Sequence, residues 1–217
     1  MVKKNSFRES LRELDNYVLA IGKIAENAVK KSIQALKEGD LALAREIIKE
    51  DDHIDEMELF LEERSTRLIA MQQPVDKDLR MVIVISKILI DIERVGDHAV
   101  NIATKVLDIN GEEIKIPVDD IYKMADLAIR RFHESLEAFV NMDVELAQKV
   151  AKEDEKLDIL DEENLNDMIG LISEDKEFAK QATALMFIGR FLERIGDHST
   201  NICERVIYMS SGTREKY

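Results

Sequence analysis

Acidic side chains recur at one-turn intervals in four stretches of the chain, and this spacing is the pattern that could support chemistry. Asp51 and Asp55 are four residues apart, and so are Asp154 and Asp158. Two other stretches, ERVGDHAVNIATKV and ERIGDHSTNICERV, each place a Glu, an Asp and an Asn at the same interval. Those six residues are Glu93, Asp97, Asn101, Glu193, Asp197 and Asn201. Residues four apart share one face of a helix, so each stretch predicts a stripe of oxygen ligands.

Like charges at this spacing repel one another unless a counterion lies between them. A multivalent cation would relieve the repulsion, and oxygen ligands suit magnesium, calcium, manganese or iron. The chain has 45 acidic residues, however, so the stripes could also be solvated faces in which Arg94 and Arg194 pair with the acids. His98 and His198 lie about 140° around the helix from the glutamate. We therefore expect both to be partly exposed or hydrogen-bonded side chains rather than metal ligands.

The chain contains an internal duplication. Residues 93–106 recur as residues 193–206, and Lys30-Lys31 matches Arg130-Arg131 at the same offset. The two DxxxD segments align at an offset three residues larger, after an insertion of about one helical turn. We predict two halves, residues 1–111 and 118–217, joined by a linker at about residues 110–117.

The composition favours long helices, because the chain has two prolines, eight glycines and only 5% aromatic residues. Apolar residues recur at helical spacing and predict six helices, which end near residues 38, 71, 108, 142, 172 and the C-terminus. Asp40, Asp76 and Asp143 are predicted N-caps. Gly96 and Gly196 remove a side chain beside the acids, so a neighbouring helix can approach closely. The predicted fold is all-α, with two tandem three-helix bundles.

Charge and cysteine content limit the classes of function. The net charge of −14 argues against a nucleic-acid partner, which needs a positive footprint. Cys203 is the only cysteine and replaces Ala103 of the first half, so we expect a small buried residue in a reducing cytoplasm. The sequence MVKKNSFRES shows no signal-peptide pattern. The most apolar run, Met81–Ile90, is too short to span a bilayer, so we expect no direct membrane insertion.

The motifs resemble the PhoU family of phosphate-signalling regulators over essentially the whole chain. The resemblance lies in ERVGDHAVNI, ERIGDHSTNI, the DxxxD segments at Asp51 and Asp154, and QPVDKDLRMVIVISKI at Gln73–Ile88. The last segment is similar to a family stretch with the pattern Q-P-x-x-x-D-L-R. Its counterpart at Glu174–Ile188 lacks the proline and the Leu-Arg pair.

The resemblance implies two tandem three-helix bundles, a homodimer, and metal centres built from paired E(D)xxxD motifs. One centre would use Asp51, Asp55, Glu93 and Asp97. The other would use Asp154, Asp158, Glu193 and Asp197, and Asn101 and Asn201 continue the two stripes. A multinuclear iron cluster is the first expectation, and zinc, manganese or magnesium are the alternatives.

The resemblance also implies a negative regulator of the phosphate starvation response that modulates phosphate uptake. Its expected partners are the ATPase subunit of the phosphate ABC transporter and a phosphate sensor histidine kinase. They would hold it in the cytoplasm, peripheral to the inner membrane. No nucleotide motif, phosphate cradle or nucleophile constellation occurs in the sequence, which favours a protein without catalytic residues. Two alternatives remain: a ferritin-like carboxylate-bridged metalloenzyme, a class that directs Glu-x-x-His pairs inward, and a purely structural helical adaptor.

Overall fold

The chain folds into helices. The computed structural model describes residues 2–213, apart from the side chains of residues 2–6 and 52. Within these residues there is no strand, which confirms the predicted fold class. The elements are α1 (Val2–Glu38), α2 (Leu41–Glu50), α3 (Asp52–Gln72), α4 (Asp76–Ile109), α5 (Asp119–Asn141), α6 (Val144–Ala151), α7 (Asp154–Glu174), the 3-10 helix η1 (Lys176–Phe178) and α8 (Ala179–Ser211).

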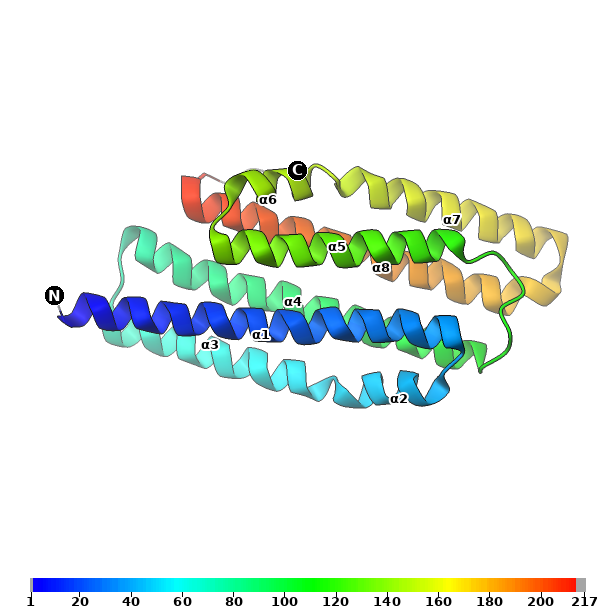
Figure 1. Ribbon diagram of the computed structural model, residues 1–217, viewed down its shortest axis with the longest axis horizontal. Coiled ribbons are helices and arrows are strands. Elements are labelled where there is room, and N and C mark those ends of the chain that lie inside the picture. The colour runs from blue at the N-terminus through cyan, green and yellow to red at the C-terminus, as the bar shows by residue number, and fades with distance from the viewer. Residues whose placement is uncertain (1, 214–217) are drawn as a thin grey trace.

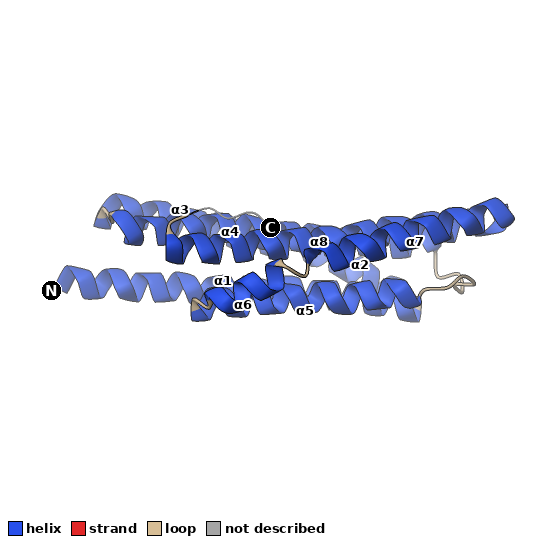
Figure 2. Cartoon of the chain, turned by 90° about the horizontal axis from the view of Figure 1, so that it is seen from above, coloured by secondary structure: helices blue, strands red, loops and turns tan. Residues whose placement is uncertain are grey.

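Each half is a bundle of three long helices with one short additional helix (Figure 1). In the first half α1, α3 and α4 are long and α2 is short. In the second half α5, α7 and α8 are long and α6 is short. The view from above shows α1 and α5 in one layer and α3, α4, α8 and α7 in another (Figure 2). The halves meet where α4 contacts α8 and α1 contacts α5.

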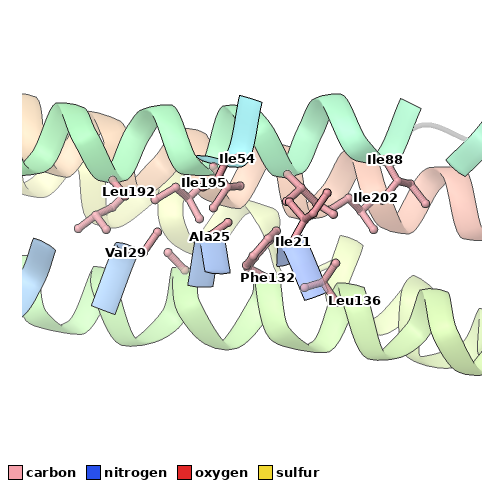
Figure 3. Close-up of a cluster of buried hydrophobic side chains, with 14 of the residues drawn as sticks. Ile21, Ala25, Val29, Ile54, Ile88, Phe132, Leu136, Leu192, Ile195 and Ile202 are labelled. Carbon is pink, nitrogen blue, oxygen red and sulfur yellow. The ribbon is translucent and has the colours of Figure 1, made fainter. Parts of the chain in front are cut away.

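The two halves share one hydrophobic core (Figure 3). Ile21 and Ala25 of α1 face Phe132 and Leu136 of α5, and all four side chains are buried. Ile88, Leu192, Ile195 and Ile202 close the same core from α4 and α8. Because these side chains from both halves are buried against one another, the two halves stabilise each other by apolar burial.

Two of the six predicted helices are each broken into two, so the described chain has eight α-helices instead of six. The breaks fall at residue 51, between α2 and α3, and at residues 152–153, between α6 and α7. The first break lies within the acidic run Glu50–Asp52, and the second lies at the start of the acidic run Glu153–Glu155. Crowded like charges and the low helix propensity of aspartate weaken the helix there. The bend lets both pieces bury their apolar faces, as Ile47 of α2 and Ile54 of α3 show.

The N-cap predictions were right at two positions and wrong at the third. The Asp40 carboxylate accepts hydrogen bonds from the amides of Ala42 and Leu43, and Asp143 accepts one from Leu146. Asp76 does not cap α4, because it is the first residue of that helix, with φ of 51° instead of the extended conformation of an N-cap. Of the helices in the described part of the chain, none is long and apolar enough to cross a membrane.

Candidate metal centres

The second half brings three of its predicted ligands together. One carboxylate oxygen from each of Asp158, Glu193 and Asp197 lies within 4.8 Å of the other two. Asp158 comes from α7, and Glu193 and Asp197 lie one turn apart on α8. Glu193 is only 7% exposed, and its Oε2 has no hydrogen-bond partner among the described residues. A buried carboxylate oxygen without a partner is costly, and a cation bound by the three side chains would satisfy it.

The raised pKa values of its carboxyl groups also show that ionisation is unfavourable at this second centre. Burial, followed by the adjacent Asp197 carboxylate, raises the pKa of Glu193 to about 7. Burial, followed by the carboxylates of Asp154 and Asp158, also raises the pKa of Asp197. Arg190 partly offsets this at the rim, with Nη1 3.0 Å from Glu193 Oε1 and 3.4 Å from Asp161 Oδ2. The centre favours added positive charge.

Asp154, the fourth predicted ligand of the second centre, is already held by a cation of the protein. Arg131 Nη2 donates to Asp154 Oδ1 at 2.8 Å and to the Thr200 hydroxyl at 2.6 Å. Thr200 in turn donates to the same oxygen of Asp154 at 2.9 Å. Arg131 is 0% exposed, and its Nε and Nη1 atoms have no partner among the described residues. Arg131 and Thr200 were not predicted as site residues, although both differ from their counterparts, Lys31 and Val100, in the duplication.

The first centre has the same residue types, but the only described acids that come within 4.8 Å of one another as a set of three are those of the second centre. Burial, followed by Asp97, raises the pKa of Glu93, and Asp55 and Glu58 on α3 raise it further. These acids therefore face one another across α3 and α4. Arg94 contacts two of them, with Nε 3.2 Å from Glu93 Oε2 and Nη1 2.8 Å from Asp97 Oδ2. This pairing is the one expected of a solvated face, and Arg94 is itself exposed.

The remaining predicted residues lie at the edges of the stripes. Asp51 is half-buried at the break between α2 and α3, and Asn101 is exposed. Asn201 donates a hydrogen bond to Asp91 Oδ1 on α4 at 3.4 Å. The assignment of all ten residues as metal ligands stays a prediction.

Gly96 and Gly196 do permit the close helix approach that was predicted. A Cβ on Gly96 would lie 2.7 Å from Ile54 Cδ1. A Cβ on Gly196 would lie 2.5 Å from Leu157 Cδ1 and 2.8 Å from Arg131 Nη1. The missing side chains bring the DxxxD helix of each half against the helix that carries the Glu and Asp.

The two histidines lie between the halves. His198 Nδ1 is 3.1 Å from Asp91 Oδ1, so this side chain is hydrogen-bonded as predicted. Arg205 forms an ion pair with the same buried aspartate and donates to the Lys87 carbonyl oxygen at 2.7 Å. The His98 ring lies 5.7 Å from that of His198, measured between ring centroids, and 5.8 Å from that of Phe191.

Comparison with known proteins gives a consistent result. The PhoU domain pattern matches residues 18–106 and again residues 121–206. A Phosphate-specific transport system accessory protein PhoU homolog from Clostridium acetobutylicum is 40% identical over 207 residues, which cover 95% of this chain and 94% of the relative. The Phosphate-specific transport system accessory protein PhoU of Escherichia coli K12 is 31% identical over 206 residues, covering 95% of this chain and 86% of the relative.

Solved structures agree in fold. The crystal structure of PhoU from Pseudomonas aeruginosa superposes with a TM-score of 0.92 at 33% identity, covering 95% of this chain and all of that one. The phosphate transport system regulatory protein PhoU from Streptococcus pneumoniae also gives a TM-score of 0.92, at 30% identity, covering 97% of this chain and all of that one. The repeated domain match, the full-length relatives and the shared fold lead to one conclusion: the chain belongs to the PhoU family.

Proposed function

We propose that this chain is a metal-binding accessory protein of phosphate-specific transport, acting as a regulator and not as an enzyme. The relatives named above, which it matches along nearly their whole length, support the link to phosphate transport. One observation carries the metal part of the proposal. Glu193 is buried beside Asp158 and Asp197, and one of its oxygens has no partner among the described residues.

The second centre would hold metal through Asp158, Glu193 and Asp197, and the first through Asp55, Glu93 and Asp97. Asp51 and Asp154, which precede Asp55 and Asp158 by four residues, complete the two predicted sets. The donors are all oxygen atoms, which fits hard or borderline cations. A multinuclear iron cluster is our first candidate, and zinc, manganese or magnesium are the alternatives. The bound metal would supply the positive charge that removes the repulsion within each carboxylate set.

We place the protein in the cytoplasm at the inner membrane, where it acts as a homodimer with two partners. These are the ATPase subunit of the phosphate ABC transporter and the phosphate sensor histidine kinase. Through them it keeps the phosphate starvation response off when phosphate is abundant, and it modulates uptake. The relatives' names support the link to the phosphate-specific transport system, which is the part of this proposal that they reach.

The regulatory part is tested by deleting the gene in its host and following a starvation-response reporter in phosphate-rich medium. The reporter should become constitutively active and should be silenced again by the wild-type gene. A reporter that stays off in the deletion strain contradicts the proposal. Co-purification of the chain with the transporter ATPase and the kinase tests the two partners directly.

The metal part is tested by elemental analysis of protein purified without chelator. The double variant Glu193→Gln/Asp197→Asn should lose the metal of the second centre and keep that of the first. Glu93→Gln/Asp97→Asn should do the reverse. Glu163→Gln is a matched control, because Glu163 is an exposed acid on α7 outside both stripes. Wild-type protein without bound metal, or variants with unchanged metal content, would overturn this part.

A purely structural adaptor is the competing function, and one observation favours it. Arg94 pairs with both Glu93 and Asp97, so the first stripe is partly neutralised without metal. The elemental analysis separates the two functions, because an adaptor would be isolated without stoichiometric metal. Oxygen consumption by iron-loaded protein tests the metalloenzyme alternative, for which we expect a rate no higher than that of free iron.

A further inference from the structure

The hairpin formed by α7 and α8 carries an exposed apolar patch. Leu165 and Ile169, one turn apart on α7, are 39% and 49% exposed, and Phe187 of α8 is 47% exposed. We call these three residues, together with the half-buried Met186, the Phe187 patch. A pocket of about 280 Å³ opens beside them, and its lining consists of Asp161, Leu165, Met186, Phe187 and Arg190. The tip of this hairpin reaches beyond the start of α5 (Figure 1).

The Phe187 patch differs in charge from the matching surface of the first half. Residues 164–172 and 178–189 contain two charged side chains, Asp167 and Lys180. The matching residues 61–69 and 78–89 contain seven, which are Glu62, Glu63, Arg64, Arg67, Asp78, Arg80 and Lys87. Glu62 is the counterpart of Leu165, and Lys87 is the counterpart of Phe187. The same fold therefore accepts charged residues at both positions, so folding alone does not require the apolar ones.

The two charged residues in the pocket lining form an ion pair. Arg190 Nη1 lies 3.4 Å from Asp161 Oδ2. At the border of the patch, Lys105 of α4 has its Nζ 5.1 Å from the centroid of the Phe187 ring and pairs with Asp108. The Phe187 ring also stacks on Phe191, with 6.3 Å between the ring centroids. The patch is thus an electrically balanced surface with one well-supported aromatic ring.

We infer that two copies of this chain associate through the Phe187 patch, with Phe187 of each copy inserted into the pocket of the other. This inference rests on the homodimer of the proposed function and gives that homodimer its interface. A contact with two-fold symmetry needs a projecting group and a matching recess on the same patch, and this patch has both. A cavity of about 150 Å³ already holds benzene, so a pocket of about 280 Å³ accommodates a phenyl ring.

The charge of the chain favours a second copy as the occupant of this surface. Two copies that each carry a net charge of −14 repel one another, so they meet most favourably where each has little charge. The interfaces of homodimers are also more apolar than those of transient complexes. A regulatory partner of so acidic a chain would be attracted by opposite charge, which the Phe187 patch does not offer.

The test is the self-association of the full-length chain, measured by sedimentation velocity over a range of concentrations. Leu165→Glu/Phe187→Lys gives the patch the residues that the first half carries at the matching positions, and it leaves the net charge unchanged. We expect the wild-type chain to sediment as a dimer. Dimerisation of the variant should be weaker by at least about tenfold, because an aromatic anchor in a pocket carries much of the binding energy.

Leu59→Glu/Phe60→Lys is the matched control. It makes the same chemical changes on α3 of the first half, at side chains that are 62% and 48% exposed. Because these residues lie outside the Phe187 patch, this variant should dimerise as strongly as the wild-type chain.

Photo-crosslinking tests the same contact without removing an aromatic side chain. A phenylalanine analogue that carries a benzophenone group replaces Phe187 in one preparation and Phe60 in another. Irradiation should produce covalent dimers of this chain from position 187 and none from position 60. Mass spectrometry of the dimers should locate the crosslink within residues 161–190 of the second copy.

If Leu165→Glu/Phe187→Lys dimerised as strongly as the wild-type chain, this inference would be overturned and the proposed homodimer would stand. An equal loss of dimerisation in the Leu59→Glu/Phe60→Lys control would have the same consequence, and so would the absence of covalent dimers from position 187. A wild-type chain that stays monomeric at every concentration would overturn both the inference and the proposed homodimer.

Discussion

In the second half Asp154 is bound by the buried Arg131, whereas in the first half the counterpart of that arginine, Lys31, lies near the surface beside Glu46 and Glu50. The halves therefore share a backbone plan and an acidic pattern but differ in how the acids are balanced. The second half uses an internal guanidinium and keeps a compact carboxylate set. The first half uses an exposed arginine, Arg94, and keeps a pocket.

The contact between α4 and α8 shows the same divergence. Asp91 pairs with Arg205, and its counterpart in the duplication is Phe191. Lys105, the counterpart of Arg205, has its Nζ 5.1 Å from the centroid of the Phe187 ring. One side of this contact is thus ionic and the other is aromatic. Duplication preserved the helix packing and allowed the charges to change.

The largest expected difference between the halves is at this contact. Arg205→Met should destabilise the fold by about 3–5 kcal/mol, because it leaves the buried Asp91 carboxylate without its main counterion. Lys105→Met removes a partly exposed cation from an aromatic ring and should cost less than about 1 kcal/mol. Urea unfolding of both variants measures the difference. Equal losses of unfolding free energy in the two variants would show that the Asp91–Arg205 ion pair contributes no more to stability than the contact of Lys105 with Phe187.

A second difference should appear in the pH dependence of metal-free protein. The folded state raises the pKa of Glu193 from the usual 4.5 to about 7, so it binds more protons than the unfolded state between these pH values. Stability from this group is present below about pH 4.5 and is lost as the pH rises to about 7, by roughly 2–3 kcal/mol. Glu193→Gln should remove this loss.

Glu93→Gln is the matched variant in the first half. Burial also raises the pKa of Glu93, but its side chain is more exposed, 21% against 9% for Glu193. We expect a smaller change in the slope of unfolding free energy against pH. If Glu93→Gln changed this slope more than Glu193→Gln did, ionisation would be less favourable in the first centre than in the second, contrary to our assignment.

The two helix-approach glycines should also respond differently. Gly196→Ala places a methyl group against Leu157 and the buried Arg131, and should destabilise by about 1–2 kcal/mol despite the better helix propensity of alanine. Gly96→Ala meets only the end of Ile54, which lines the pocket and has room to move. It should be neutral or slightly stabilising in thermal unfolding. Destabilisation by Gly96→Ala equal to that by Gly196→Ala would argue against a pocket beside Ile54.

The smallest effect is expected at Cys203. Burial raises the pKa of its thiol to about 12, so the side chain is neutral and should react with thiol reagents only after unfolding. Because Ala103 occupies the matching position, Cys203→Ala should change stability by less than about 1 kcal/mol. Rapid labelling of the native protein would contradict the burial of this residue.

The helical fold and the acidic stripes could be predicted because both depend on local periodicity. The duplication aligns the residues of one half with those of the other. This alignment made it possible to predict that the DxxxD helices pair with the Glu and Asp of α4 and α8. The breaks at residues 51 and 152–153 could not be predicted, because they depend on burial against a neighbouring helix. The ion pair of Arg131 with Asp154 depends on tertiary contacts in the same way, although its mismatch with Lys31 was visible in the alignment of the halves.

The shared core has a consequence for the association of the two halves. Ile21 and Ala25 are buried against Phe132 and Leu136, so either half alone would expose this apolar surface to water. A single three-helix unit would need a second copy to cover this surface, and that association would depend on concentration. Carrying both copies in one chain makes the association permanent and lets each copy have its own charges.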